Sequence, residues 1–320
     1  MIRSYQLHNG LLREQPLDME ELTQELRQLR ESSWIDLQEA SEDEIHMVEQ
    51  LHPESLPEVE DVEEIESSAR YFIEGQDLHV HSLFLYQSEG RHRTATVAFT
   101  LKPDVLLSIR DVDLADFRLL RLRSRRGWVE AGSPLQILTS IFQLKVDNLA
   151  DQLEDLLGDL DDISSEILAN RDEELGEPMD KLAKLEDSNG KIRLCLMDTQ
   201  RSVSFLLRNI RQHPEVQEGC REILRDLDTL MAHAAFIFEK IDFLMNTSQG
   251  FINIQQAKII KIFSIAAVVF LPPTMIASIY GMNFEFMPEL HWVAGYPFAL
   301  GMMLMAGVTP YLFFRYKGWL

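Results

Sequence analysis

The sequence predicts an α+β membrane protein, in which an N-terminal α/β domain is followed by a long helical stalk and two C-terminal transmembrane helices. Two charge-free runs, 262–282 and 292–314, are each about 20 residues long, enough to cross roughly 30 Å of hydrocarbon as a helix. Apolar residues recur every three or four positions in the region before the first run, which indicates long helices. Short β-rich runs separated by turn residues occupy 1–130, which indicates a mixed α/β domain.

Several elements of the first domain can be assigned individually. Ser41 and Glu44 form a capping box that opens a helix over 42–52, because each side chain can satisfy a free backbone amide of the other. The acidic segment 57–68 is expected to form another helix, and a basic helix over 114–126 is expected to end at Gly127. The expected strands are 34–37, 71–74, 78–86, 94–101 and 105–110, with a turn at 102–104.

Long helices follow this domain. An acidic helix that includes 151–177 is expected to break near Gly176-Glu-Pro178 and to return through about residue 211 as a helical hairpin. A second break at His213-Pro214 precedes an apolar-periodic stretch without proline until Pro272, so a single helix of more than about 60 residues is expected to enter the first charge-free run. So long a helix needs neighbours, which predicts a coiled, oligomeric stalk.

Charge divides the chain at the same place. The whole chain has a formal net charge of −22, and the acidic residues lie almost entirely before Lys258. An acidic domain repels nucleic acid and attracts cations, so no nucleic-acid partner is expected, although solubility alone explains the charge equally well. Lys258, Lys261, Arg315 and Lys317 flank the charge-free runs, whereas 283–291 has no Lys or Arg. The positive-inside rule therefore places both chain ends in the cytoplasm.

Other features of the chain carry weaker signals. The first 30 residues are charged throughout, so no cleavable signal peptide is expected. Cys195 and Cys220 are expected to be reduced packing residues. His79 and His81 share one face of a strand, where ordinary strand surface is favoured over a metal site. The acidic residues of 151–177 are expected to form a solvated helix face. No catalytic arrangement has local support, so no enzyme is expected.

The first charge-free run carries a stripe of small and hydroxyl-bearing residues. Two helices cannot enclose a polar pathway, so transport would require several copies around an axis. The stripe suits either a pore wall or close helix packing, and both interpretations stay open. Pro272-Pro273 leaves carbonyl groups without donors in mid-membrane, which requires protein or water beside them. The second run is bulkier and fits an outer, lipid-facing position. The stripe consists of Ala257, Ser264, Ala267, Leu271, Thr274, Ser278 and Gly281.

A specific motif follows the first run. Tyr280-Gly281-Met282-Asn283, followed by Phe-Glu-Phe-Met-Pro-Glu-Leu290, resembles the signature of the CorA magnesium channel family. The resemblance spans essentially the whole chain and includes its aromatic and basic end, Tyr316-Lys317-Gly-Trp319-Leu320. It implies a funnel-shaped homopentamer of the inner membrane that conducts Mg²⁺ passively, and also Co²⁺ and Ni²⁺, under the control of cytoplasmic Mg²⁺.

The resemblance implies that Gly281, Met282 and Asn283 from each chain form the outer selectivity filter. Neutral amide and carbonyl oxygens can hydrogen-bond a hydrated Mg²⁺ without stripping its waters, and they release it faster than a charged ring would. Asn283 supplies the amide, and Gly281 is expected to permit a tight turn. Glu285 and Glu289 can raise the cation concentration outside, although ordinary solvated loop charge explains them as well.

By the same analogy, constrictions lie along the first run. Phe263 and Leu271 are the candidate hydrophobic gate, and Thr274 and Ser278 are positioned to hydrogen-bond the waters of a passing ion. The chain departs from many relatives near the cytoplasmic entrance, where Ala257 stands in place of a polar asparagine. Asn253 lies one turn earlier.

Magnesium sensing in the family is implied to use cytoplasmic carboxylates between subunits. Glu89 and Glu222 are the nearest acidic candidates.

Two other functions stay open: a proton-coupled zinc transporter of the related ZntB-like branch, and a membrane-anchored sensor that conducts nothing. The expected domains are a cytoplasmic α/β domain (1–130), a cytoplasmic long-helix stalk (131–257), the pore helix (258–282), an external loop (283–291), the second transmembrane helix (292–314) and a basic cytoplasmic tail (315–320).

Overall fold

The computed structural model describes residues 1–15, 22–53, 70–169, 175–210, 213–283, 285 and 287–318. These residues form two compact units. The first comprises Met1–Ala169 and Gly176–Met245, and the second consists mainly of Asn246–Leu320. The helix expected over 57–68 lies outside the described residues.

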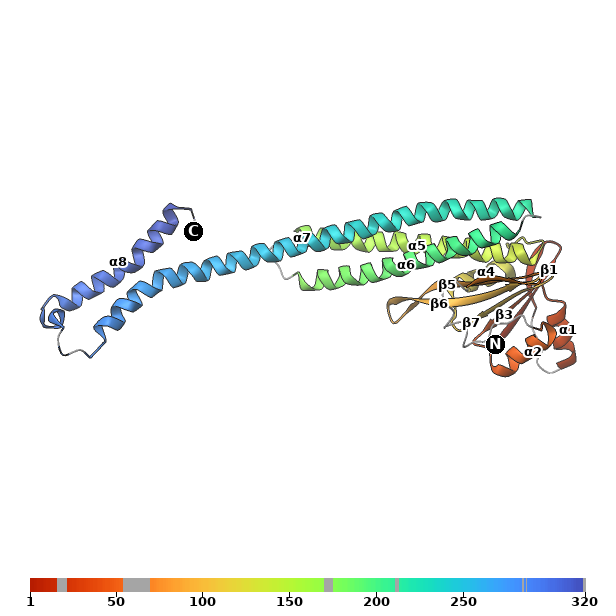
Figure 1. Cartoon of the computed structure of the whole chain (residues 1–320), viewed down its shortest axis with the longest axis horizontal. Helices are drawn as coiled ribbons and strands as arrows, with labels where there is room; N and C mark the ends of the chain where they lie inside the picture. The colour runs from red at the N-terminus through yellow and green to blue at the C-terminus, as the bar shows by residue number, and fades with distance from the viewer. Residues whose placement is uncertain are drawn as a thin grey trace. The chain divides into compact units, whose positions relative to one another are not determined.

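A mixed β-sheet forms the centre of the first unit (Figure 1). Within the described part of the chain it has seven strands in the order β2-β1-β3-β7-β6-β5-β4. Only the β3–β7 pair is parallel. The strands are β1 (Ile2–His8), β2 (Leu11–Gln15), β3 (Trp34–Gln38), β4 (Tyr71–Glu74), β5 (Asp77–Ser88), β6 (Arg91–Leu101) and β7 (Leu106–Arg110).

All the expected strands are therefore confirmed, and β5 and β6 extend further than expected. Their antiparallel register continues to the Ser88–Arg91 pair, where Glu89 and Gly90 both have positive φ, as a tight hairpin turn requires. The turn at 102–104 is confirmed by the hydrogen bond from the Lys102 N–H to the Val105 carbonyl, 2.9 Å. The sequence analysis missed β1 and β2, whose buried and exposed residues do not alternate regularly.

Helices cover both faces of the sheet (Figure 1). The helices α1 (Leu22–Arg30) and α2 (Glu42–Leu51) cover one face, where Leu29 and Val48 join an apolar cluster with the strands. The helices α4 (Ala115–Arg125), α5 (Pro134–Ala169) and α6 (Gly176–Asn209) lie over the other face. The capping box at Ser41 is present, and Gly127 follows α4 with a φ of 70°.

The break between α5 and α6 lies earlier than expected. The helix α5 ends at Ala169, whereas Gly176 and Pro178 belong to the first turn of α6. Proline is tolerated there because the first amides of a helix have no intrahelical carbonyl partner to lose. The Gly176-Glu-Pro178 signal therefore marks the start of α6, and the expectation of one acidic helix over 151–177 was wrong because Leu175 is not helical.

A buried polar network joins α5 and α6 to the sheet. The Asp198 carboxylate accepts hydrogen bonds from the Ser82 hydroxyl at 2.6 Å and from the Leu83 N–H at 2.7 Å. It also accepts one from the Tyr71 hydroxyl at 2.9 Å. Lys145 Nζ lies 3.9 Å from the same carboxylate and donates to the Ser82 hydroxyl at 2.8 Å. The network fixes the register of the helices on β5 because each buried charge has its partner on another element.

The two strand histidines are buried, so the prediction that they form exposed strand surface was wrong. His79 is 3% exposed and His81 is 1% exposed. The Phe72 ring stacks on His79 with centroids 4.4 Å apart. Burial lowers the pKa of both histidines, that of His81 to about 4. Cys195 and Cys220 are buried free thiols, as expected, and burial raises their pKa to about 12 and about 11.

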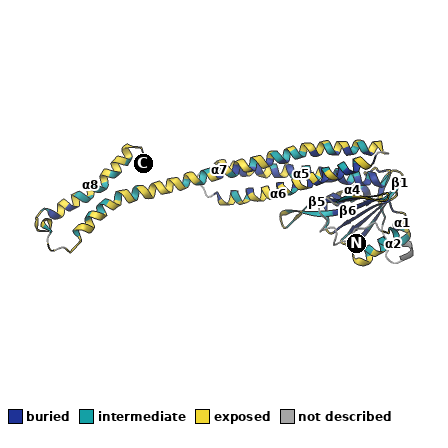
Figure 2. Cartoon of the chain, viewed as in Figure 1, coloured by how far each residue is buried: buried dark blue, intermediate teal, exposed yellow. Residues whose placement is uncertain are grey.

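The helix α7 (Pro214–Tyr280) contains 67 residues and contributes to both units, which confirms the single long helix. In the first unit one stripe of it is buried, including Cys220, Ile223 and Leu227. In the second unit it is followed by the short helix η1 (Pro288–His291) and by α8 (Gly295–Tyr316). Both α7 and α8 contain a segment long and apolar enough to cross a membrane. Figure 2 shows that buried residues gather in the first unit, whereas these segments are largely exposed.

Candidate ion pathway

The helix α8 packs against one face of the membrane segment of α7. The residues of this face are partly covered, whereas their neighbours are exposed. Gly307 of α8 makes the close approach, since a Cβ at this position would lie 3.3 Å from Pro273 Cγ and 3.5 Å from the Val269 carbonyl oxygen. Small residues permit such contacts between membrane helices. The covered face of α7 consists of Ile265, Ala266, Val269, Pro272, Pro273, Ile276 and Tyr280.

The stripe of small and hydroxyl-bearing residues lies on the opposite face of α7. At about 100° per residue, Leu271, Thr274 and Ser278 lie about 140–200° around the helix from Val269. All three are exposed, as are Ser264, Ala267 and Gly281. The chain therefore leaves this stripe uncovered while its own second helix covers the bulky face.

Two bulky side chains interrupt the stripe or border it. Leu271 is 65% exposed, and Phe263, which lies at its edge, is 72% exposed. The Thr274 hydroxyl donates a hydrogen bond to the Phe270 carbonyl oxygen at 2.8 Å. Its oxygen lone pairs are directed away from that bond and can still accept a hydrogen bond. Asn253 lies about four turns before Ala267, on the same side of the helix. Its side-chain oxygen accepts a hydrogen bond from the Gln249 side-chain amide at 3.3 Å.

Gly281, Met282 and Asn283 are exposed at the end of α7. The Gly281 N–H donates to the Ala277 carbonyl at 3.0 Å, and the Met282 N–H donates to the Ile279 carbonyl at 3.3 Å. Gly281 lies at the turn that follows the last residue of α7, and its φ is not positive. The missing side chain of Gly281 avoids a close contact, because a Cβ would lie 3.2 Å from the Ala277 carbonyl oxygen.

A second glycine, Gly295, lies where the connection from α7 enters α8. Glu285 and Glu289 are both exposed within it. The Glu289 carbonyl accepts a hydrogen bond from the Trp292 N–H at 3.3 Å, and a Cβ on Gly295 would collide with that same carbonyl oxygen. Gly295 is therefore required for the tight return into α8. The two carboxylates remain at the surface near the end of the uncovered stripe.

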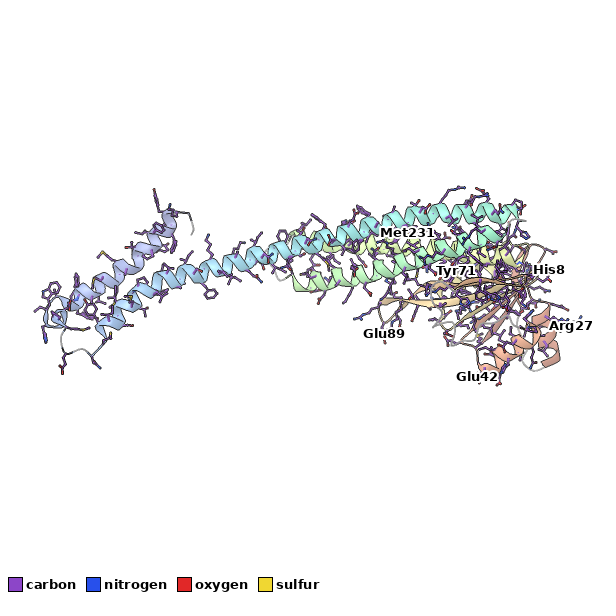
Figure 3. The ribbon with its side chains drawn as sticks, viewed as in Figure 1. His8, Arg27, Glu42, Tyr71, Glu89 and Met231 are labelled. Atoms are coloured by element: carbon purple, nitrogen blue, oxygen red, sulfur yellow. The ribbon has the colours of Figure 1, made fainter. Side chains whose placement is uncertain are left out.

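The two expected sensing residues lie on different elements of the first unit. Glu89 occupies the free end of the β5–β6 hairpin (Figure 3), where its carboxylate lies 3.4 Å from Arg93. Glu222 is exposed on α7. No group of three metal-ligating side chains is formed within the described part of the chain. The described residues of one copy therefore do not complete a metal site at either carboxylate.

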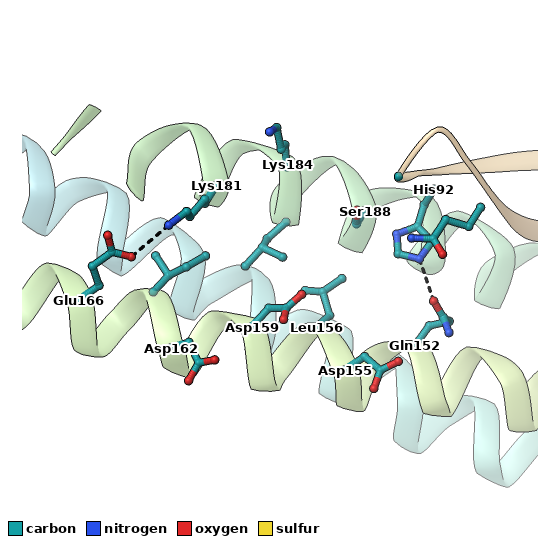
Figure 4. Close-up of a pocket in the computed structure, with 14 residues that line it drawn as sticks. His92, Gln152, Asp155, Leu156, Asp159, Asp162, Glu166, Lys181, Lys184 and Ser188 are labelled. Atoms are coloured by element: carbon teal, nitrogen blue, oxygen red, sulfur yellow. Dashed lines mark hydrogen bonds and ion pairs between the residues drawn. The ribbon is translucent and has the colours of Figure 1, made fainter. Parts of the chain in front are cut away.

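The acidic face of α5 borders a pocket of about 420 Å³ between α5, α6 and the β5–β6 hairpin (Figure 4). Asp155, Asp159 and Asp162 line it from α5, and Lys181 of α6 pairs with Glu166 at 3.3 Å. The three aspartates are exposed. They are spread along the helix rather than gathered around one point, which agrees with the expected solvated face.

Comparison with known proteins identifies the family to which this chain belongs. The family model described as CorA-like Mg²⁺ transporter protein matches residues 30–316. The chain belongs to the CorA-like Mg²⁺ transporter family. It is 44% identical to the magnesium transport protein CorA of Escherichia coli strain K12, and 42% identical to that of Yersinia pseudotuberculosis. Each alignment covers 100% of both chains.

Solved structures share the fold. The complete CorA magnesium transporter of Methanocaldococcus jannaschii superposes with a TM-score of 0.77 at 18% identity, over 100% of this chain and 99% of that one. The full-length CmaX protein gives a TM-score of 0.71 at 17% identity, over 98% and 96%. The ZntB cytoplasmic domain of Vibrio parahaemolyticus gives 0.59 at 8% identity, over 78% and 96%. The CorA-like architecture of an α/β domain, a long helix and two C-terminal apolar helices is thus confirmed.

The sequence analysis missed the residues that hold the first unit together. The Lys145–Asp198 pair is one example, and the buried Arg110–Asp36 ion pair at 2.8 Å is another. Lys145 is preceded by Leu144 and followed by Val146 in a strongly apolar part of α5, and Asp36 lies within a buried strand. A charged residue inside an apolar run is the signal that could have found both pairs.

Proposed function

We propose that several copies of this chain, five by the family resemblance, surround an axis and conduct Mg²⁺ through a pore lined by the uncovered stripe of α7. The observation that supports this most is the opposition of the two faces: α8 covers Val269 and Ile276, whereas Thr274 and Ser278 on the other side remain free. A polar stripe that no other described helix of its own chain covers needs water or other copies beside it in a membrane.

The stripe assignment can be tested by cysteine accessibility in liposomes. The native Cys195 and Cys220 are buried, so an impermeant thiol reagent has little background target. Ser278→Cys is expected to lose transport on reaction with the reagent, because the added charge stands in the pore. Ile276→Cys, on the face covered by α8, is the matched control and is expected to keep transport. Block of the control but not of Ser278→Cys would place the pathway elsewhere.

At the outer end of this pore, Gly281, Met282 and Asn283 form the filter. The amide oxygen of Asn283 and the carbonyls beside it can hydrogen-bond the hydration shell of Mg²⁺, an ion that gives up its waters reluctantly. Glu285 and Glu289 raise the cation concentration at this mouth. Phe263 and Leu271 narrow the pathway further in and form a hydrophobic gate. Co²⁺ and Ni²⁺, with similar hydration shells, are expected to pass as well.

Flux of Mg²⁺ into liposomes, followed with a Mg²⁺-sensitive dye, tests the filter. Asn283→Ala is expected to abolish the flux, whereas His291→Ala, a change of another exposed polar residue in the same connection, is expected to leave it intact. Zinc-only flux coupled to proton movement would support the ZntB-like alternative. No flux of any divalent cation in the unaltered protein would support a membrane-anchored sensor instead.

Cytoplasmic Mg²⁺ closes the pore by bridging copies through Glu89 and Glu222. Both carboxylates are exposed and lie on different elements, so bound ions would neutralise repulsion between copies and hold the assembly closed. The Glu89→Ala/Glu222→Ala protein is expected to stay open at millimolar internal Mg²⁺. Asp226→Ala, one turn from Glu222 and equally exposed, is the control. Normal closure of the double variant would exclude these ligands.

The same proposal sets the orientation in the inner membrane. The basic residues Lys258, Lys261, Arg315 and Lys317 remain on the cytoplasmic side with both chain ends, and the Asn283–His291 connection is external. In the Glu285→Cys protein, an impermeant thiol reagent added outside intact cells is expected to label the introduced cysteine. Labelling only after the membrane is opened would reverse the topology.

A further inference from the structure

A strongly basic surface of this acidic chain lies on α4 and contains none of the residues assigned to the ion pathway. The segment Phe117–Trp128 contains Arg118, Arg121, Arg123, Arg125 and Arg126 and no acidic residue, although the whole chain has a net charge of −22. Among the described residues, only Arg118 and Arg125 of these five pair with a carboxylate, Asp113 and Glu14 respectively, each at 2.7 Å.

The arginines are closer to one another than helix stability favours. Arg121 and Arg125 are four residues apart on α4, and like charges at that spacing destabilise a helix. Arg123 and Arg125 in the last turn interact favourably with the helix dipole, but that effect accounts for only one or two cations. The remaining positive charge is available to an anion from outside the chain.

A concave site is present beside this surface. A pocket of about 530 Å³ lies between β2 and the end of α4. Arg13, Arg125 and Arg126 line it together with Glu14, so three cations face one carboxylate. Arg13 is exposed on β2, and neither it nor Arg126 has a carboxylate partner among the described residues. A guanidinium group binds phosphate oxygens through two parallel hydrogen bonds.

An exposed aromatic ring adjoins the pocket. Trp128 is 66% exposed, and the Arg126 guanidinium lies over its ring at 5.0 Å from the centroid. Gly127, with a φ of 70°, turns the chain after α4, and the Trp128 N–H is fixed by a hydrogen bond to the Arg123 carbonyl at 2.9 Å. A tryptophan face held in place beside arginines can stack on a nucleobase.

We infer that this surface binds a nucleoside polyphosphate. The phosphates contact Arg13, Arg125 and Arg126 in the pocket, and the base stacks on Trp128. The ligand displaces Glu14 from Arg125 or shares that guanidinium with it. The volume of the pocket is in the range of small-molecule sites. The site lies in the first unit and contains none of the residues assigned to ion conduction, so it stands or falls independently of the proposed channel.

Isothermal titration calorimetry on the detergent-solubilised full-length protein, at constant free Mg²⁺, tests the inference with ATP and with inorganic tripolyphosphate. Arg13→Gln/Arg126→Gln is expected to weaken binding of both at least tenfold. Arg121→Gln/Arg123→Gln removes the same amount of charge from α4, outside the pocket, and is expected to change binding less than threefold. Equal weakening by both double variants would reduce the effect to general electrostatic attraction and overturn the site.

Trp128→Ala separates a nucleotide from a simple phosphate anion. It is expected to weaken ATP binding about fivefold and to leave tripolyphosphate binding unchanged. Equal affinity of the unaltered protein for the two probes, with no effect of Trp128→Ala, would overturn the nucleotide assignment. Tighter binding to phosphatidylglycerol vesicles or to a single-stranded RNA oligonucleotide than to ATP would also overturn it, as would no saturable ATP binding up to about 10 mM.

Discussion

Single buried charges decide the stability of the first unit. Lys145 is 1% exposed, and burial lowers the pKa of its ammonium group. Asp198 and the ring of Phe84, 4.3 Å away, face this group and favour its charged form. This carboxylate also accepts hydrogen bonds from β5 and from Tyr71, so one side chain supports several elements at once.

Asp198→Asn is expected to destabilise the protein by about 3–5 kcal/mol, because it leaves the Lys145 charge buried without a counterion. Urea unfolding followed by circular dichroism measures the change. Asp187→Asn on the same helix removes an exposed carboxylate paired with Lys191 and is expected to cost about 0.5 kcal/mol. Equal losses for the two variants would show that the buried network contributes little.

The buried histidines give the first unit a dependence on acid pH. The pKa of His81 is about 4 in the folded protein because of burial, below its ordinary value of 6.5. Above pH 6.5 the ring is neutral in both states and has no effect. As the pH falls from 6.5 to about 4, the unfolded chain binds a proton that the folded chain refuses, so stability decreases by about 3 kcal/mol.

His81→Gln is therefore expected to flatten the fall in unfolding free energy between pH 6.5 and 4, whatever its effect on stability at pH 7.5. Urea titrations at several pH values measure the slope. His46→Gln is the control, because His46 has a side chain that is 75% exposed. A slope unchanged by His81→Gln and altered by His46→Gln would contradict the assignment.

At the scale of elements, the packing of α8 on α7 depends on a single small residue. Gly307→Leu is expected to force the helices apart, at a cost of about 1–3 kcal/mol, because the new side chain would overlap Pro273 and the Val269 backbone. Gly301→Leu on the same helix is the control, since nothing lies within 4 Å of a Cβ there. Size-exclusion chromatography and Mg²⁺ uptake measure the outcome; equal tolerance of both changes would contradict this helix pairing.

Much of the element structure was predictable from the sequence because its signals are local. The capping box at Ser41 and the proline at the start of α7 depend on residues within one turn of each other. The sequence also contained the stripe on α7 but left its meaning open. A stripe of small residues is compatible with packing or with a pore, and only the position of α8 on the opposite face favours one of them.

Other features depend on contacts between distant segments and could not be predicted. β1 and β2 are recognised only when paired with each other and with β3. His79 and His81 looked like strand surface because nothing in their neighbourhood shows that this face of β5 is covered. The sensing role of Glu89 and Glu222 remains a prediction for a related reason. The proposed ion bridges lie between copies, and a single chain does not contain those contacts.

At the scale of the whole molecule, the chain separates its charges from its membrane segments. The acidic residues belong almost entirely to the first unit, and basic residues flank the membrane runs. An acidic domain attracts cations. For the proposed pore, inward transport of Mg²⁺ needs a driving force.

We propose that the membrane potential supplies this force. A divalent ion gains about 4.6 kcal/mol on crossing 100 mV, twice the value for a single charge, which permits roughly a two-thousandfold accumulation at equilibrium. Mg²⁺ uptake into liposomes is expected to rise steeply when a potassium gradient with valinomycin makes the interior negative, and to need no ATP. Asn283→Ala liposomes under the same potential control for leakage. Uptake that ignored the potential but followed an imposed pH gradient would show that proton coupling, and not the field across the pore, moves the ion.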